Sequence, residues 1–158
     1  MKTNNLIRYL ETIRRFLLET FQRCLTDWLK RRARLNQISG ASRTYVVAEG
    51  DKVVAYYCLA SGALALNNAP SAIRRNMPDP LPTAVLGRLA VDQAWQDRGM
   101  GVALLQDAVL RTMCASDILG IRGLVVHALS IEAKTFYEHH GFLASPTQPM
   151  TLILSLKR

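Results

Sequence analysis

Apolar residues recur at helical spacing in the N-terminal part of the chain. They are Leu6, Leu10, Ile13, Leu17, Phe21, Cys24 and Trp28. Intervals of three and four positions place these side chains on one face of an α-helix, and Arg8, Arg15 and Arg23 lie near the opposite face. The pattern predicts a basic amphipathic helix over 6–29. The segment that follows, KRRARLNQISGAS, loses the apolar stripe and ends in turn residues.

The pattern then changes to short β-rich runs. Residues 44–48 and 52–60 flank an EGD turn and predict a hairpin. The segment 67–82 predicts a loop, because it holds four of the six prolines. Residues 83–92 predict a strand, in which Gly87 indicates a bulge or a close backbone approach.

Helices alternate with strands in the rest of the chain. Residues 99–116 predict a helix, and 123–129 predict a short apolar strand. A second helix is predicted to start at Ser130 and to be closed by Gly141, before a final strand over 151–156. Helices placed between strands predict an α/β (α+β) fold, and a length of 158 residues fits a single domain.

A glycine-containing turn, QDRGMG at 96–101, separates a predicted strand from a predicted helix. The unpaired N–H groups and the dipole of a helix N-terminus attract anions. Gly99 and Gly101 leave the backbone open to a phosphate. The turn is neither a dinucleotide fingerprint nor a Walker loop, because it lacks a third glycine and a terminal Lys-Ser/Thr. Taken alone it is a weak signal, since such a dipeptide can also be only a turn.

Two motifs in this order resemble those of the GNAT family, the Gcn5-related N-acetyltransferases. The pattern Q/R-x-x-G-x-G/A is met by QDRGMG after the strand end LAV, and A-x-x-[LF]-Y-E-x-x-G-F is met by AKTFYEHHGF at 133–142. The resemblance implies a GNAT fold, with a mixed and mostly antiparallel central sheet flanked by helices. It also implies an enzyme that transfers an acetyl group from acetyl-CoA to an amine.

The same resemblance assigns roles in binding acetyl-CoA. Backbone groups of Leu89, Ala90 and Val91 would bind the pantetheine arm. The pyrophosphate would lie against the loop and helix start formed by Gln96, Asp97, Arg98, Gly99, Met100 and Gly101. Ser130 and Phe136 would add further contacts, although family members often carry Asn where this chain has Ser130, which puts that contact in doubt.

The reaction needs an acid for the leaving thiolate, and the resemblance assigns this role to Tyr137. A phenol with its ordinary pKa near 10 is protonated when a CoA thiolate leaves. From the residues alone, a core tyrosine packed beside Phe136 is the alternative. No strong general base is evident, and water could suffice for the acidic α-amino group of an aminoacyl ester. His127 is either a base or substrate contact, or a strand histidine with its hydrogen bonds satisfied.

The remaining histidines and the cysteines are not spaced as metal ligands. His139 and His140 are expected at the surface near a helix C-terminus. Cys24, Cys58 and Cys114 are scattered and are expected to be small core residues in a reducing compartment. Because no His/Cys/Asp cluster has the spacing of metal ligands, we predict no metal site.

Further segments resemble a subfamily of GNAT toxins from toxin–antitoxin pairs. They are SGASRT, RRNMPDPLP, LGRLAVD, VHALSIEAKTFY and SPTQPMTLILSL, and the likeness runs from about Thr26 to the C-terminus. These toxins acetylate the amino group of aminoacyl-tRNA. The resemblance therefore implies aminoacyl-tRNA as substrate, a block of translation, a ribbon-helix-helix antitoxin as partner, and a homodimer.

Residues 1–25 depart from this resemblance. Such toxins usually begin with a strand, whereas one helical stripe occupies these positions here. Either the first strand is lost or the helical period misrepresents it. Loss of the strand would uncover a sheet edge, which the stripe, a second subunit or a membrane surface could cover.

The positive charge is concentrated at the N-terminus. The net charge is +8, and residues 1–43 hold ten of the 20 Lys/Arg but three of the 12 Asp/Glu. Such asymmetry indicates a polyanionic partner, with a solvated basic face as the alternative. The candidates for tRNA phosphate contacts are Arg31, Arg32, Arg34, Arg43, Arg74, Arg75 and Arg88, of which Arg43 and Arg88 stand in the segments most similar to the toxins.

Two other functions remain open on the sequence. One is acetylation of a small amine or a protein N-terminus. The other is a non-catalytic remnant that acts by binding, which the intact QDRGMG and Tyr137 disfavour. With no membrane-length apolar run and no secretory signal pattern, a cytoplasmic location is expected.

Overall fold

A computed structural model describes residues 4–5 and 28–156, which belong to two compact units. The first unit comprises Met1–Ala60 and Gly87–Ala108, and the second comprises Ser61–Leu86 and Val109–Arg158. Within these described residues, seven strands follow the hydrogen-bonded order β1-β2-β3-β4-β5-β7-β6. The pairings β1–β2, β2–β3, β5–β7 and β6–β7 are antiparallel, whereas β4 and β5 are parallel. The prediction of a mixed, mostly antiparallel sheet in an α/β fold is confirmed.

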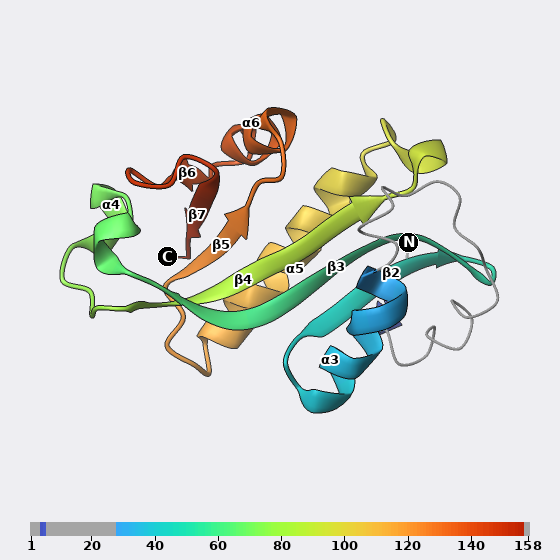
Figure 1. The fold of residues 1–158 in the computed structure, drawn as a ribbon, viewed down its shortest axis with the longest axis horizontal. Coiled ribbons are helices and arrows are strands. Elements are labelled where there is room, and N and C mark those ends of the chain that lie inside the picture. The colour runs from blue at the N-terminus through green and yellow to red at the C-terminus, as the bar shows by residue number, and fades with distance from the viewer. Residues whose placement is uncertain (1–3, 6–27, 157–158) are drawn as a thin grey trace. The chain divides into compact units, whose positions relative to one another are not determined.

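Strand β2 (Arg43–Glu49) and the part of β3 (Lys52–Leu64) up to Ala60 form the predicted hairpin in the first unit, and the rest of β3 belongs to the second. A π-helical turn at Leu29–Ala33 continues into α3 (Arg34–Ser39), which lies beside β2 (Figure 1). This unit also contains the end of β4 (Leu81–Val91), a 3₁₀ turn at Gln93–Trp95, and the start of α5 (Met100–Ser116).

The helix around α3 corrects one prediction. The sequence indicated that the apolar stripe is lost after residue 29, yet the segment stays helical to Ser39. Its buried positions are Leu29, Ala33 and Gln37, four residues apart, so a small and a polar side chain continue the stripe. Leu29 and Ala33 belong to a core with Val46, Val53, Tyr56 and Ala90, against which Trp28 packs. The rest of the predicted N-terminal helix, 6–27, lies outside the described residues.

Of the two alternatives left open for the N-terminus, loss of the first strand is wrong. Strand β1 (Asn4–Asn5) pairs antiparallel with β2, with Asn4 opposite Val46 and Asn5 opposite Tyr45. A two-residue ladder uses backbone groups alone, so it leaves little periodicity for a sequence to reveal. At these positions the edge of β2 is therefore paired.

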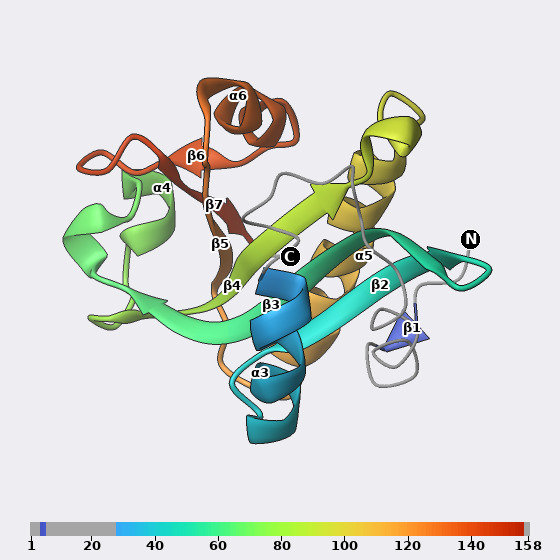
Figure 2. The same ribbon diagram turned by 45° about the vertical axis from the view of Figure 1, so that its right-hand side comes forward.

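The second unit is built on β5 (Gly123–His127), β7 (Thr151–Ser155) and the start of β4. After β5 the chain forms α6 (Ile131–His139) and returns through β6 (Leu143–Ala144) to β7 (Figure 2). The predicted strand over 123–129 thus ends earlier, at His127. The core of this unit consists of Leu64, Ala69, Ile73, Leu81, Val125 and Ile153.

The segment predicted as a loop contains two short helices. They are a 3₁₀ turn at Leu66–Asn68 and α4 (Ser71–Arg74). Pro70 directly precedes α4, where a fixed φ and a missing N–H do not oppose helix formation. Ile73 of α4 is buried in the core, so tertiary packing stabilises a helix in a segment that was predicted to be a loop because of its four prolines.

We expect the fold to be sensitive to any side chain at Gly123. A Cβ there would lie 2.6 Å from Ile153 Cδ1, 2.8 Å from Ile153 Cγ1 and 3.0 Å from the Leu154 carbonyl oxygen. Gly123→Ala should therefore destabilise the protein by about 1–3 kcal/mol in urea unfolding. Gly120→Ala is the control, because its Cβ would meet no atom within 4 Å. Equal stability of the two variants would contradict this packing.

Candidate active site

The end of β4 carries a stretch of backbone suited to bind an extended ligand. Its ladder with β5 joins Thr83–Leu86 to Gly123–Val126, whereas β4 continues to Val91. On the other side, the Asp92 N–H donates to the Val54 carbonyl of β3 at 2.8 Å. The predicted pantetheine contacts Leu89, Ala90 and Val91 lie on this extension. The sequence indicated a bulge or a close backbone approach at Gly87; in the structure the close neighbour is a side chain, because a Cβ there would lie 2.9 Å from Cys58 Sγ.

Cys58 is held inert beneath this strand. It is buried, and burial raises the pKa of its thiol to about 11. This confirms the prediction of a core cysteine at this position, whereas Cys114 is exposed and Cys24 lies outside the described residues. Among the residues that the structure describes, no group of His, Cys, Asp and Glu side chains could hold a metal ion.

Asp92 fixes the start of the glycine-containing loop, a role that the sequence analysis missed. Its side chain is 0% exposed, accepts a hydrogen bond from the Ala94 N–H at 3.0 Å, and pairs with Lys52 Nζ at 3.2 Å. Asp92 thereby caps the Gln93–Trp95 turn. The signal that could have found it is an aspartate placed directly after a buried strand.

The loop itself has the backbone expected of an anion site. Asp97 and Gly99 have φ values of +60° and +75°, and a Cβ on Gly99 would meet no atom within 4 Å. Residues Gln96–Gly99 are exposed, and Met100 begins α5. The start of α5, with its N-terminal N–H groups and its helix dipole, therefore lies beside open space at Gly99, an arrangement that suits a phosphate.

Two side chains of the loop are used to hold its shape. Gln96 Nε2 donates to the Val91 carbonyl at 3.1 Å, which ties the loop to the end of β4. The Arg98 guanidinium lies 5.2 Å from the centre of the Trp95 ring, a cation–π contact. These contacts leave the backbone of the loop and the remaining N–H groups of Arg98 for a ligand.

In the second unit, the caps of α6 fix the position of Tyr137. Ser130 begins the helix, and its hydroxyl accepts a hydrogen bond from the Ala133 N–H at 3.1 Å. At the other end, the Phe142 N–H donates to the Tyr137 carbonyl and the Gly141 N–H to the Glu138 carbonyl, both at 3.1 Å. This is a Schellman motif, and Gly141 supplies its left-handed residue with φ of +90°. The predicted helix closure at Gly141 is thus confirmed.

Tyr137 lies in an aromatic environment that favours its protonated form. Its side chain is 7% exposed, and its ring contacts those of Phe136 and Phe142 at centroid distances of 5.3 and 5.4 Å. Desolvation by this burial raises the pKa of Tyr137 to about 12. None of the described residues forms a hydrogen bond with its hydroxyl. The phenol therefore keeps its proton at neutral pH and can donate it to a ligand.

The histidines occupy different environments. His127 is exposed at the end of β5, with Nδ1 3.0 Å from Thr151 Oγ1. His140 Nδ1 donates to the Phe136 carbonyl at 2.7 Å, and its ring lies beside His139. His139 is exposed at the end of α6 as predicted, whereas His140 is only partly exposed.

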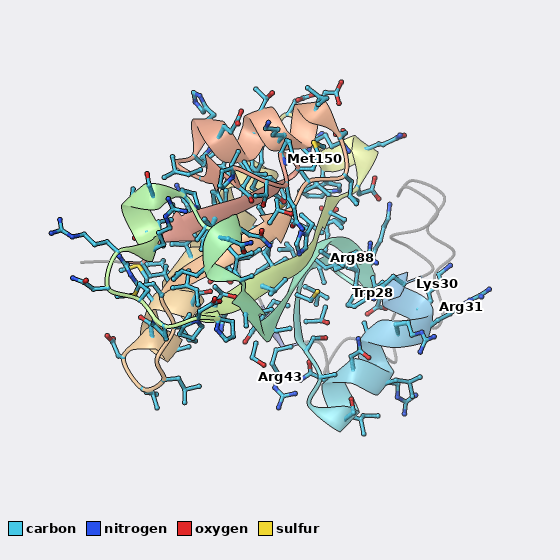
Figure 3. All side chains as sticks on the ribbon, turned by 60° about the vertical axis from the view of Figure 1, so that its left-hand side comes forward. Trp28, Lys30, Arg31, Arg43, Arg88 and Met150 are labelled. Carbon is cyan, nitrogen blue, oxygen red and sulfur yellow. The ribbon has the colours of Figure 1, made fainter. Side chains whose placement is uncertain are left out.

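Arg88 and Trp28 form an ordered pair in the first unit (Figure 3). The guanidinium carbon of Arg88 lies 5.6 Å from the centre of the Trp28 ring, which stacks on Tyr56 at 6.1 Å with an interplanar angle of 5°. This support limits the motion of the guanidinium and leaves its planar edge for an oxyanion. Lys30 and Arg31, which follow Trp28 on the helix, are exposed.

The seven arginines predicted to contact tRNA divide between the two units, and Arg31, Arg32 and Arg34 are exposed in the first. Arg43 and Arg88 belong to the first, and Arg74 and Arg75 belong to the second. Arg43 is exposed at the start of β2, and one of its N–H groups donates to the Gln37 carbonyl at 3.1 Å. Arg74 ends α4, and both Arg74 and Arg75 are exposed.

Comparison with known proteins assigns the family. The acetyltransferase (GNAT) domain matches residues 40–143. The chain belongs to the GNAT family. A GNAT domain is an acetyl-CoA-dependent acetyltransferase, so the predictions of family, enzyme class and cosubstrate are confirmed.

Individual GNAT relatives are more specific. A tRNA-acetylating toxin of Mycobacterium tuberculosis (strain ATCC 25618 / H37Rv) is 48% identical over 133 residues, which cover 84% of this chain and 80% of the relative. The structure of AtaT complexed with acetyl-methionyl-tRNAfMet matches with a TM-score of 0.81 and 27% identity, covering 90% and 86% of the two chains. A mutant AtaT toxin bound to acetyl-CoA and the C-terminus of the antitoxin AtaR matches with a TM-score of 0.73 and 26% identity, covering 91% and 85%.

No helix in the described part of this GNAT chain is long and apolar enough to span a bilayer. The loop and the end of β4 suit the anionic and extended parts of acetyl-CoA, because they combine open space at Gly99 with β4 backbone that extends beyond the β5 ladder.

We expect Gly99→Ala to weaken acetyl-CoA binding at least about tenfold in calorimetry. A Cβ would strain the left-handed residue and enter the space where the phosphate binds. Gly50→Ala is a matched control, since Gly50 also has a positive φ of +57° and open space, but lies in the β2–β3 turn. Similar melting temperatures with a loss of affinity only in Gly99→Ala would support the site. Equal affinities would contradict it.

Proposed function

We propose that this chain transfers the acetyl group of acetyl-CoA to the amino group of aminoacyl-tRNA and so blocks translation, as the toxin of a toxin–antitoxin pair. The observation that carries the proposal is the 48% identity, over most of both chains, to a tRNA-acetylating toxin. The likeness to AtaT complexed with acetyl-methionyl-tRNAfMet supports the same substrate class.

In this proposal the first unit binds acetyl-CoA. The backbone of Leu89–Val91 orients the pantetheine arm, and the amides of Asp97–Gly101 bind the pyrophosphate. Met100 anchors the helix start in the core, since it is 3% exposed. Ser130 and Phe136 remain proposed cosubstrate contacts in the second unit. The Ser130 hydroxyl oxygen already accepts a hydrogen bond from the Ala133 N–H, so in the proposal the hydroxyl hydrogen is donated to the cosubstrate.

Tyr137 supplies the proton that the leaving group needs. Its hydroxyl donates to the sulfur as the C–S bond breaks, which avoids release of a free thiolate. The raised pKa keeps the phenol protonated, and the Schellman motif and the two phenylalanine rings fix its direction.

Arginines are proposed to bind the tRNA backbone. Arg88 is supported by its contact with Trp28, and Arg43, which donates to the Gln37 carbonyl, lies in the same unit. A guanidinium held in one orientation loses less entropy on binding a phosphate than a mobile side chain does. Arg74 and Arg75 would contribute further phosphate contacts from the second unit.

We also infer the partners and the place of action. The mutant AtaT structure that contains the C-terminus of the antitoxin AtaR supports an antitoxin partner for this chain. A ribbon-helix-helix fold for that antitoxin and a homodimer of this chain remain parts of the proposal. Because aminoacyl-tRNA is a substrate of the translation machinery, the proposal places the activity in the cytoplasm. The family match spans both units, which supports one acetyltransferase domain.

Tyr137→Phe should lower the rate of acetyl transfer to a pool of aminoacyl-tRNA by about 10²–10⁴-fold, because the thiolate would leave without a proton donor. Labelled acetyl-CoA measures the product, and calorimetry should find its affinity unchanged. Tyr45→Phe is the control, since Tyr45 lies on β2 and stacks with Tyr57. Full activity of Tyr137→Phe would remove Tyr137 from its role, and no labelled tRNA with the wild type would overturn the proposed substrate.

Arg88→Lys should raise KM for aminoacyl-tRNA with little change in kcat, because Lys keeps the charge but not the planar fork stacked on Trp28. Arg88→Ala should raise KM further. It should also reduce the slope of log affinity against log salt concentration by the amount expected for about one lost phosphate contact. Arg122→Ala is the control, since Arg122 hydrogen-bonds Ser155 in the second unit. A salt dependence equal to that of the wild type would exclude a phosphate contact of Arg88.

A further inference from the structure

A chain of hydrogen bonds at the start of β7 orients His127. His127 lies directly opposite Thr151 in the antiparallel β5–β7 ladder, and its Nδ1 lies 3.0 Å from Thr151 Oγ1. Thr151 Oγ1 in turn donates to Gln148 Oε1 at 3.3 Å, and the Thr151 N–H donates to the Gln148 carbonyl at 2.9 Å. Thr151 is 6% exposed, so solvent competes little for its hydroxyl.

The direction of these hydrogen bonds determines which ring nitrogen of His127 carries the hydrogen. The single hydrogen of the Thr151 hydroxyl is used toward Gln148, so Thr151 Oγ1 acts as an acceptor toward His127. His127 Nδ1 must then be the donor. A neutral imidazole with its hydrogen on Nδ1 has its lone pair on Nε2. Since His127 is exposed, that lone pair is available to a ligand.

The position of His127 in the second unit suits a reaction that also uses Tyr137. His127 is the last residue of β5, and the ladder with β4 ends one residue earlier, at Val126. Only Ala128 and Leu129 separate it from Ser130, the N-cap of the helix that carries Tyr137. The Ala128 N–H donates to the Met150 carbonyl at 2.8 Å, which holds this connection against the start of β7.

The same strand also positions Tyr137. After the Schellman motif the chain forms β6, whose Leu143 and Ala144 pair with Ile153 and Leu152 of β7. Thus β7 sets the His127 ring through Thr151, and sets the end of α6 through β6. Neither other histidine is placed in this way, since His139 and His140 lie at the end of α6 and His140 Nδ1 is occupied by a carbonyl of its own helix.

We propose that His127 Nε2 is the proton acceptor for the attacking amine, with Thr151 as the positioning residue that fixes its tautomer. The proposal rests on the proposed acetyl transfer to aminoacyl-tRNA. As the amine nitrogen bonds to the acetyl carbonyl carbon, Nε2 takes one proton from that nitrogen. As the C–S bond breaks, Tyr137 gives one proton to sulfur. His127 then loses its proton to water and Tyr137 regains one from water, so the products are the amide and the free thiol.

The test compares His127→Ala with His139→Ala, a histidine that the proposal leaves without a role. Acetyl transfer is measured with two acceptors, the aminoacyl-tRNA pool and glycine ethyl ester, a small α-amino ester. We expect His127→Ala to lower kcat about 10²-fold with both acceptors, to keep acetyl-CoA affinity, and to be partly rescued by added imidazole. His139→Ala should match the wild type.

Thr151 provides a second, independent test. Thr151→Val keeps the β-branched shape but removes the hydroxyl, and we expect kcat to fall about tenfold with little change in KM. Thr151→Ser should restore the rate. Melting temperatures of both variants show whether they fold.

Each outcome bears on one of the two proposals. A wild-type kcat in His127→Ala, or a loss that imidazole does not rescue and that includes acetyl-CoA binding, would overturn the role of His127. Transfer by the wild type to glycine ethyl ester but not to tRNA would overturn the proposed substrate, while His127 is still tested on the ester. Wild-type protein that acetylates neither acceptor would overturn both.

Discussion

The antiparallel register between β5 and β7 is the constraint on which the chemistry of the second unit depends. Opposite residues in such a ladder have Cβ atoms about 4.5–5.5 Å apart, so the pairing of His127 with Thr151 brings imidazole and hydroxyl into hydrogen-bond range. A shift by one residue would turn every side chain to the other face of the sheet. Gly123 protects the register, because Ile153 occupies the space that a side chain there would need.

The first unit depends instead on backbone conformation. Left-handed residues at 97 and 99 turn the chain sharply between a 3₁₀ turn and α5, and the buried Asp92 holds the entry to that turn. In the proposed site the loop would bind its ligand chiefly through N–H groups, which every residue except proline has. Its side chains are used to preserve its shape, as Gln96 and Arg98 are in contact with Val91 and Trp95. Such a loop is preorganised, and binding an anion costs it little rearrangement.

The sequence predicted the elements whose signals are local and strong. The hairpin, the strand with Gly87, the helix after the loop and the cap at Gly141 follow from periodicity and from residues with special φ, and the two motifs predicted the family. Contacts that form only in the folded chain could not be predicted. Ile73 shares a buried core with Leu81 and Ile153, and this packing stabilises a helix where a loop was expected. Ala33 and Gln37 are buried on the face of the N-terminal helix that the apolar residues alone had indicated to end at residue 29. Arg88 was predicted, but its support by Trp28 was not, because the two residues are distant in sequence.

The environments of Tyr137 and His127 differ in the way that acid and base chemistry requires. Tyr137 is surrounded by aromatic rings, where burial disfavours the phenolate, so the phenol holds its proton at neutral pH. His127 is exposed, while its contact with Thr151 bears on which ring nitrogen holds the lone pair. In the proposal, a buried acid and an exposed base therefore lie on either side of one short β–α connection. Ala128 and Leu129 form this connection, and the Ala128 N–H ties it to the Met150 carbonyl at the start of β7.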